Sequence, residues 1–305
     1  MSSTDSLKEN KDYNKHPRTL GITPLKKLGQ NFLINQSIIN EFLEKADLNQ
    51  KDIILEIGSG TGNLTEKIAK KVKTVIAVEK DPTLVKILKE NLKRKNIKNV
   101  KIIQDDIQKI FNSNFLIFNY KKYKIVANLP FYLTAPLIRQ FLELLKNCPE
   151  TMTLIIQKEL AQRICALPSK IIKKEKFKKK GLSKMNLLAA SIQFYAQVKI
   201  INYISKKFFW PQPKVDSAII KIIPHQKIFY QHLLNNLNFR EKFFKIIRSG
   251  FSHPRKQLAN NLSKMLKLNK DQVKNWLFKN NVYPQQRAEE LEIKDWISLS
   301  STFFF

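Results

Sequence analysis

The feature that most constrains this fold is the regular alternation of short apolar runs with amphipathic stretches between Leu25 and Pro224. Apolar runs bounded by turn residues are typical of buried strands, and the stretches between them have helical spacing. The alternation predicts an α/β domain whose mostly parallel sheet is covered by helices on both faces. Strands are expected at 53–57, 74–78, 100–103, 124–127, 151–156, 197–203 and 217–223, and helices at, for example, 64–71, 82–95 and 135–145.

The end of this pattern divides the chain. A proline-rich loop instead of a helix separates the last two strands, so we expect the last strand to be antiparallel. Beyond Pro224 only helices are expected, at 229–237, 240–250, 255–266, 270–279 and 294–299. We therefore predict a basic, disordered tail over 1–24, an α/β domain over 25–225 and a smaller helical domain over 226–305.

The charge of the chain points to a polyanionic partner. Lysine and arginine number 55 against 25 acidic residues, which gives a net charge of +30. A bias in nucleotide composition could enrich lysine, but it does not explain why acidic residues fail to rise with it. We therefore favour a nucleic-acid partner. A lysine-rich insertion at 170–184 is either a solvated loop or an arm that contacts RNA.

Cysteine and histidine usage disfavours a metal site and a disulfide framework. Cys148 and Cys165 are the only cysteines, and the 4 histidines stand singly. This is typical of a reducing compartment. No apolar run approaches the roughly 20 residues that span a bilayer, and the start lacks a secretory signal. We expect a cytoplasmic protein without membrane or metal partners, and an organelle-targeting role for the tail stays open.

A glycine-rich turn follows the first predicted strand. Gly58, Gly60 and Gly62 form a G-x-G-x-G pattern, with Glu56 two residues before the first glycine. This form resembles motif I of the S-adenosylmethionine-dependent methyltransferases rather than a dinucleotide-binding loop. Glu79 follows the second strand and is placed to accept the hydrogen bonds of a ribose diol. Asp105 and Asp106 follow the third, where an acid can accept from an adenine amine.

The tetrapeptide Asn128-Leu129-Pro130-Phe131 follows the fourth strand. The Asn128 amide offers one acceptor and two donors, Pro130 stiffens the turn, and Phe131 adds a flat apolar face. This combination suits a planar ring that carries an exocyclic amine, such as adenine or cytosine. Because ligands bind beyond the carboxyl ends of parallel strands, the glycine loop, Glu79, Asp106 and the tetrapeptide should meet at one sheet edge.

Several motifs together make the chain similar to the KsgA-type ribosomal RNA small-subunit adenine dimethyltransferases. The similarity extends from about Leu25 to Leu299 and rests on the glycine loop, the tetrapeptide and four further segments. These segments are Leu28-Gly29-Gln30-Asn31-Phe32-Leu33, Phe209-Trp210-Pro211-Gln212-Pro213-Lys214-Val215-Asp216-Ser217, Phe251-Ser252-His253-Pro254-Arg255-Lys256-Gln257-Leu258 and Arg287-Ala288-Glu289-Glu290-Leu291.

The resemblance implies a fold, a cofactor and a reaction. The fold would be a Rossmann-like methyltransferase sheet with an RNA-binding C-terminal helical domain. The cofactor would be S-adenosylmethionine. The family dimethylates the exocyclic N6 amines of two adjacent adenosines near the 3′ end of small-subunit rRNA, so the expected partner is the rRNA of the assembling small ribosomal subunit. We expect a monomer.

The resemblance also implies roles for individual residues. Asn31 and Leu33 would close over the cofactor, Gly58 would line its methionine end, Glu79 would bind its ribose and Asp106, rather than Asp105, its adenine. Asn128 would lie between the cofactor and the target base. Methyl transfer from a sulfonium needs positioning above all, and Asn128 with a neighbouring backbone carbonyl would favour the nucleophilic form of the amine. Phe131 would stack on the flipped base, and Phe209 is a candidate second stacking face.

The chain departs from the family pattern at two places. Met185-Asn186-Leu187-Leu188-Ala189 stands where many members carry Tyr-Gly-Arg-Leu-Ser, which affects RNA contacts rather than the chemistry, and Phe131 replaces the more usual Tyr.

Three different classes of protein stay open beside this family. The nearest is an Erm-type large-subunit rRNA methyltransferase, which usually has Ile at the Leu129 position. The second is a non-catalytic nucleic-acid-binding or transcription factor, although the cofactor residues Gly58, Glu79 and Asp106 are retained here. The most distant is an adenine-specific DNA methyltransferase, which usually carries Pro-Pro rather than Leu-Pro in the tetrapeptide.

Overall fold

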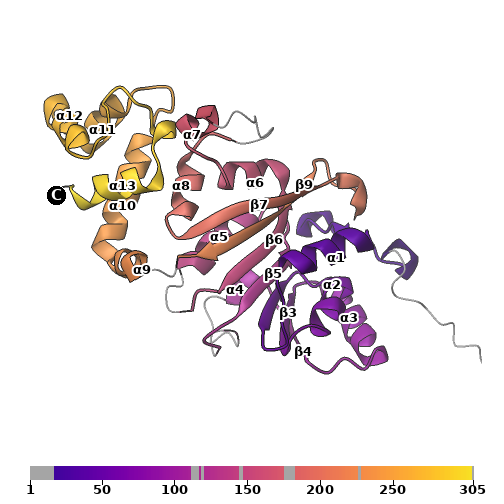
Figure 1. Cartoon of the computed structure of the whole chain (residues 1–305). Helices are drawn as coiled ribbons and strands as arrows, with labels where there is room; N and C mark the ends of the chain where they lie inside the picture. Colours follow the sequence, from indigo (N-terminus) through magenta and orange to yellow (C-terminus); the bar gives the residue numbers. More distant parts are fainter. Residues whose placement is uncertain are drawn as a thin grey trace, which may run out of the picture.

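The computed structural model describes residues 17–110, 117, 120–143, 147–174, 183–225 and 228–303. At its centre is a seven-stranded sheet in the order β4-β3-β2-β5-β6-β9-β7 (Figure 1). Its strands are β2 (Ile53–Ile57), β3 (Thr74–Glu79), β4 (Val100–Gln104), β5 (Lys124–Asn128), β6 (Thr151–Gln157), β7 (Ala196–Ile204) and β9 (Ser217–Pro224). The predicted bounds of all seven strands are therefore confirmed to within one residue at either end.

The sheet is mostly parallel, as predicted. Strands β2 to β6 pair in parallel, whereas β9 pairs antiparallel with both β6 and β7. The last strand in the chain is thus antiparallel, but it lies between β6 and β7 rather than at the edge of the sheet. The connection over residues 205–216 lets the chain turn back from β7 and insert β9 beside β6.

Helices cover both faces of the sheet, because successive strand residues point to opposite sides. Ile54 of β2 packs with the face that carries α1 (Gln36–Lys45), α2 (Asn63–Ala69) and α3 (Pro82–Arg94). Its neighbour Leu55 belongs to the opposite core. That face carries α4 (Ile107–Ile110), α5 (Thr134–Glu143), α6 (Lys158–Ile164) and α8 (Leu187–Gln193).

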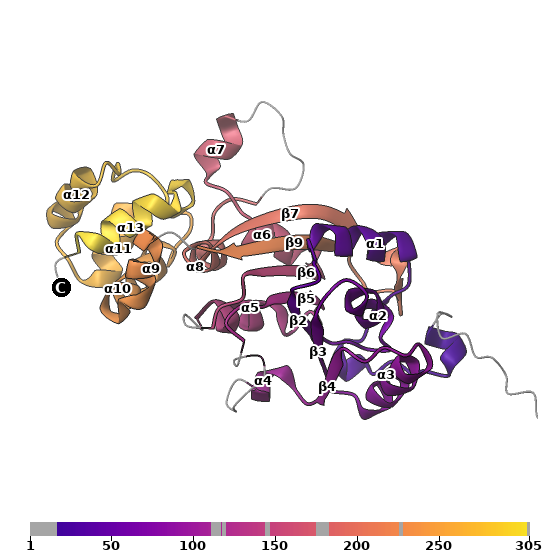
Figure 2. The same cartoon turned by 60° about the horizontal axis from the view of Figure 1, so that its bottom comes forward.

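The C-terminal part is all helical and packs directly against the core that contains Leu55. Its helices are α9 (Ile228–Asn235), α10 (Leu237–Gly250), α11 (Leu258–Leu266), α12 (Lys270–Lys279) and α13 (Ile293–Ser301). Phe243 of α10 stacks on Phe194, at the end of α8, with ring centroids 4.0 Å apart. The buried cluster therefore runs without a break from the sheet into the helical region, and Figure 2 shows the two parts side by side.

Two predicted helix starts in this region are wrong. Helix α10 begins at Leu237 rather than at residue 240, because the Asn236 side chain accepts from the Phe239 N–H and caps the helix. Helix α11 begins at Leu258 rather than at residue 255. The Leu258 N–H donates to the Gln286 carbonyl, so the preceding residues form a turn instead of a first helical turn.

The predicted tail and insertion are only partly described. Residues 1–16 lie outside the described residues, but Pro17–Leu20 form a 3₁₀ helix, η1, and Ile22 is buried. The disordered tail was therefore predicted to extend too far into the chain. In the insertion, Ser169–Lys174 form helix α7, and residues 175–182 lie outside the described residues. Lys184 at its end forms an ion pair with Glu289 of the helical part.

A small two-stranded ribbon lies outside the main sheet and was not predicted. β1 (Phe32–Leu33) pairs antiparallel with β8 (Phe209–Trp210), so that Leu33 lies opposite Phe209. The Phe32 and Trp210 rings stack with centroids 6.2 Å apart. The ribbon joins two motifs that are far apart in the sequence.

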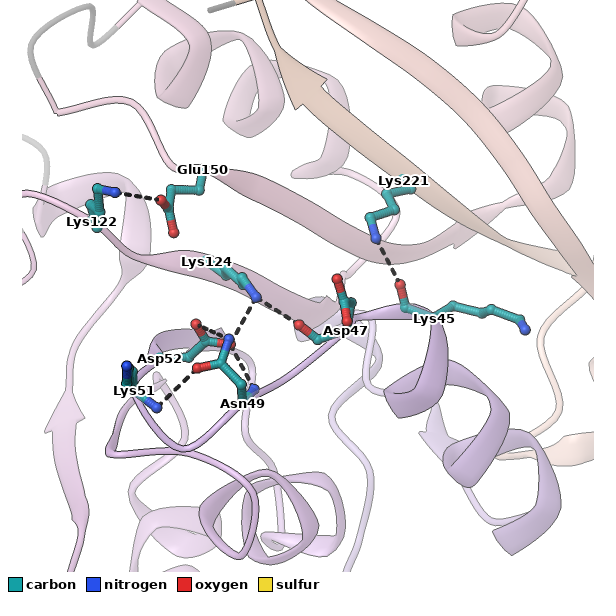
Figure 3. Close-up of polar contacts among 9 residues, drawn as sticks. All are labelled: Lys45, Asp47, Asn49, Lys51, Asp52, Lys122, Lys124, Glu150 and Lys221. Carbon is teal, nitrogen blue, oxygen red and sulfur yellow. Dashed lines mark hydrogen bonds and ion pairs between the residues drawn. The ribbon is translucent and has the colours of Figure 1, made fainter.

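The amino-terminal edge of the sheet is closed by its own polar contacts (Figure 3). Lys124 at the start of β5 donates to Asp52 at 2.8 Å and to the Asp47 carbonyl at 2.6 Å. Lys221 of β9 donates to the Lys45 carbonyl at the end of α1. These contacts tie α1 and the loop after it to the sheet.

Candidate functional site

A cavity of about 140 Å³ opens at the carboxyl edge of the parallel strands. Its walls come from the segment before α1, the glycine loop after β2, the ends of β3, β4 and β5, and Phe209. Every site residue predicted from the sequence lines it: Asn31, Leu33, Gly58, Glu79, Asp106, Asn128, Leu129, Pro130, Phe131 and Phe209. Their roles remain predictions, but their convergence on one cavity is an observed property of the fold.

The glycine loop adopts backbone conformations that favour glycine. Gly58, Gly60 and Gly62 have φ values of +73°, +57° and +92°. Gly58 leaves open space toward the cavity, since a Cβ there would meet only the Asn128 carbonyl oxygen, at 3.7 Å. The backbone of this loop is therefore accessible to a ligand that approaches closely.

Glu79 at the end of β3 is buried and held by backbone donors. Its Oε1 accepts from the N–H groups of Lys80 at 2.8 Å and Asp81 at 2.9 Å, and its Oε2 accepts from Gly60 at 2.8 Å. Burial raises the pKa of Glu79, and these N–H donors partly oppose the rise. Because a carboxylate has about four acceptor positions, about one remains for a ligand hydroxyl.

Asp106, just after β4, is paired with Lys80. The Lys80 Nζ donates to Asp106 Oδ2 at 2.8 Å, and the Gln108 N–H donates to Oδ1 at 3.0 Å. Burial alone would raise the pKa of Asp106, but the hydrogen bonds from Lys80 and Gln108 outweigh it and lower the pKa. Asp106 is therefore an ionised acceptor at neutral pH.

Asn128 is oriented by the segment that closes the cavity from the other side. Its Nδ2 donates to the Asn31 carbonyl at 3.0 Å, and the Asn31 side chain donates in turn to the Gly29 carbonyl. This bond fixes the amide plane and leaves Oδ1 without a described donor. Leu129 is buried and its N–H donates to the Ile155 carbonyl. The turn that carries Asn128 is thus anchored to the sheet.

The two predicted aromatic faces differ in accessibility. Phe131 is half-buried at the cavity, beside the exposed Tyr132. Phe209 is only 4% exposed and packs in the core of the α1 face with Leu33. Phe131 is therefore free to stack on an incoming ring, whereas Phe209 contributes a fixed wall.

The protonation state of Glu56 was not predicted from the sequence. Its side chain is 1% exposed, and neither carboxyl oxygen has a hydrogen-bond partner among the described residues. Burial raises the pKa of Glu56 to about 8; the nearby Thr65 hydroxyl opposes this rise, and the charge of Glu79 adds to it. Glu56 is therefore predominantly protonated at pH 7. An acid inside a continuous apolar strand was the signal for this, but it does not reveal whether a partner exists.

The described residues give no sign of a metal centre or of a membrane span. They contain no group of three or more histidine, cysteine, aspartate or glutamate side chains that could hold an ion. Within the same residues, no helix combines the length and hydropathy needed to cross a bilayer. Cys148 and Cys165 are free, and burial raises the pKa of each thiol to about 12.

Comparison with known proteins identifies relatives over nearly the whole chain. Residues 24–303 match the model of the family described as ribosomal RNA adenine dimethylase. A Clostridium botulinum protein named ribosomal RNA small subunit methyltransferase A is 36% identical over 92% of this chain and 94% of its own length. A protein of the same name from Dehalococcoides mccartyi is 38% identical over 90% of this chain and 86% of its own.

Solved structures support the same fold. A dimethyladenosine transferase from Plasmodium falciparum superposes with a TM-score of 0.67 at 23% identity, covering 87% of this chain and 94% of that one. The 23S rRNA methyltransferase ErmE superposes with a TM-score of 0.66 at 21% identity, covering 88% and 98%. The Rossmann-like methyltransferase fold is thus confirmed, and the chain belongs to the ribosomal RNA adenine dimethylase family.

Proposed function

We propose that this protein uses S-adenosylmethionine to dimethylate the N6 amines of two adjacent adenosines near the 3′ end of small-subunit rRNA. One observation carries the proposal. A single cavity collects a glycine loop, two carboxylates at successive strand ends and an oriented asparagine beside an aromatic ring. Family membership and the small-subunit methyltransferases among the relatives support the choice of substrate.

The cavity suits the proposed cofactor. The Ser59 hydroxyl lines it and has no described partner, Glu79 keeps one acceptor position, and Asp106 keeps acceptor positions beside its bond to Lys80. We assign Gly58, Asn31 and Leu33 to the methionine end and the closing wall, Glu79 to the ribose, and Asp106 to the adenine amine. Glu79 is left with one position rather than two, so one ribose hydroxyl is expected to be its main partner. The bound cofactor would supply an electrophilic methyl group.

Asn128 performs the central task on the target base. Its Nδ2 is engaged by Asn31, so its Oδ1 is held ready to accept a hydrogen bond from the exocyclic amine. Together with a neighbouring backbone carbonyl, this acceptor draws the amine toward the pyramidal form, whose lone pair is available for an in-line displacement. Phe131 stacks on the flipped base. No general base is required, because the methylated ammonium loses its proton to solvent.

The wider assignments follow from the same features. We propose that the protein acts as a monomer. The free thiols support a reducing compartment such as the cytoplasm. The change from a sheet to helices supports a catalytic part over 25–225 and an RNA-binding part over 226–305, acting on the assembling small subunit.

A substrate panel tests this function. Labelled S-adenosylmethionine is supplied with small subunits that lack the modification, large-subunit rRNA and duplex DNA, and the methylated positions are mapped. We expect dimethylated adenosines only in small-subunit rRNA. Label on large-subunit rRNA alone would favour the Erm-type activity, label on DNA would favour a DNA methyltransferase, and no label on any substrate would favour a non-catalytic binding factor.

A further inference from the structure

Two large aromatic rings stand on the surface of the helical part, far from the cavity. Phe278 near the end of α12 is 52% exposed, and Tyr283 is 66% exposed. Their rings meet edge to face with centroids 6.5 Å apart. Figures 1 and 2 both place α12 at the end of the molecule opposite α2 and α3, which flank the cavity. The catalytic site therefore gives no reason for these rings to be exposed.

The backbone that carries the two rings is ordered by its own turn and hydrogen bonds. Asn281 adopts a φ of +57°, which turns the chain back so that Tyr283 meets Phe278. The Val282 N–H donates to the Leu277 carbonyl at 3.0 Å, and the Tyr283 N–H donates to the Gln286 side chain at 2.8 Å. A backbone that is ordered before binding reduces the conformational entropy lost when a partner stacks on the rings.

The surroundings of the rings are basic. Lys270, Lys274 and Phe278 recur every four residues along α12, so they form one exposed stripe, while Val273, Trp276 and Leu277 form the buried side. The segment from residue 258 to 286 contains five lysines, all exposed: Lys264, Lys267, Lys270, Lys274 and Lys279. Its one acidic residue, Asp271, is paired with Lys274, so the segment keeps an excess of positive charge from the other lysines.

We infer that Phe278 and Tyr283, with the lysine stripe of α12, form a second RNA-binding surface that stacks on unpaired bases of small-subunit rRNA. An exposed aromatic face provides sequence-tolerant stacking, and the lysines beside it neutralise phosphates. Aromatic residues are also common in protein interfaces, but lysine is depleted there, so the lysines around the rings favour RNA over a protein partner. The inference rests on the proposed function, because that function supplies the RNA. It adds an anchoring point remote from the target adenosines.

Binding to small subunits that lack the modification tests the inference directly. Three variants are compared with the wild type: Phe278→Ala/Tyr283→Ala, Phe278→Leu/Tyr283→Leu, and Lys270→Gln/Lys274→Gln. Leu237→Ala on α10 is the matched control, since Leu237 is also exposed but lies outside the surface. All these side chains are exposed, so unfolding midpoints near that of the wild type are expected and are measured as a check.

The aromatic variants should both bind the subunits roughly tenfold more weakly. The lysine variant should reduce the slope of log affinity against log salt by about 1–2. Wild-type affinity in the alanine variant would overturn the inference. Weak binding by the alanine variant with full binding by the leucine variant would overturn it in favour of a protein contact. Because binding is measured without methyl transfer, a wild type that binds but does not methylate would refute the proposed function alone.

Discussion

Replacement of Glu56 by glutamine should stabilise the protein relative to the wild type, and this stabilisation should be larger at pH 8 than at pH 5. Neither Glu56 carboxyl oxygen has a described hydrogen-bond partner, and burial raises the pKa of the group from 4.5 to about 8 against the opposing effect of the nearby Thr65 hydroxyl. The folded wild type therefore keeps this proton across a range in which the unfolded chain releases it. The free energy of unfolding of the wild type therefore decreases, through the Glu56 proton, as pH rises from about 4.5 to 8.

The size of the effect follows from the pKa shift. Each pH unit between the two pKa values costs about 1.4 kcal/mol, so the full range amounts to roughly 5 kcal/mol as an upper bound. Glutamine has nearly the same shape and does not ionise, so the variant avoids this loss. For a chain of 305 residues, this upper bound corresponds to a difference in melting temperature of at most about 8 °C at pH 8.

Thermal unfolding of the two proteins at pH 5 and pH 8 measures the effect. We expect melting temperatures close together at pH 5 and a clear advantage for Glu56→Gln at pH 8. Glu90→Gln, the same change at an exposed position on α3, should show no such dependence. A difference between variant and wild type that is equal at both pH values would refute the argument, because it would mean that Glu56 is already ionised in the folded protein.

Three further changes test individual contacts. Lys80→Met removes a donor that lowers the pKa of Asp106, so Asp106 becomes protonated at a higher pH in the variant. When the pH is lowered, the affinity for S-adenosylmethionine, measured by calorimetry, should therefore begin to fall at a higher pH in the variant than in the wild type. Gly62→Ala should cost about 1–3 kcal/mol in urea unfolding, because φ is +92° and the new Cβ would lie 2.5 Å from Leu88 Cδ1. An unchanged midpoint would contradict that strain. Phe243→Ala should cost about 3–5 kcal/mol in the same assay, because its ring is fully buried between the sheet and the helical part.

Much of the fold follows from the sequence because its signals are local. The parallel strands are continuous apolar runs, and Asp81 with Pro82 marks the start of α3. The position of β9 between β6 and β7 could not be predicted, because strand order depends on packing between distant segments. The ribbon of β1 and β8 was missed for a similar reason. Each of its strands has two residues, too few for a periodic pattern.

The site shows the same division. Residues at strand ends, such as Glu79 and Asp106, could be placed because parallel strands end at one edge. The hydrogen-bond partners of these carboxylates could not be predicted from the sequence. Lys80 follows Glu79 directly in the chain, and yet its side chain pairs with Asp106. The backbone N–H groups that donate to the Glu79 carboxylate can be identified only from the folded structure. Side-chain direction and hydrogen-bond geometry are not encoded in spacing alone.

The most direct test of the account concerns Asn128. In Asn128→Ala, the acceptor for the target amine is lost, while the groups assigned to the cofactor stay in place. Single-turnover methyl transfer to small subunits should therefore fall by about 10²-fold to 10³-fold or more, by analogy with the loss of one oriented polar group in other enzymes. Calorimetric affinity for S-adenosylmethionine should stay within a few-fold of the wild type. Normal transfer by this variant would contradict the proposed role of Asn128 and, with it, the central claim about the site.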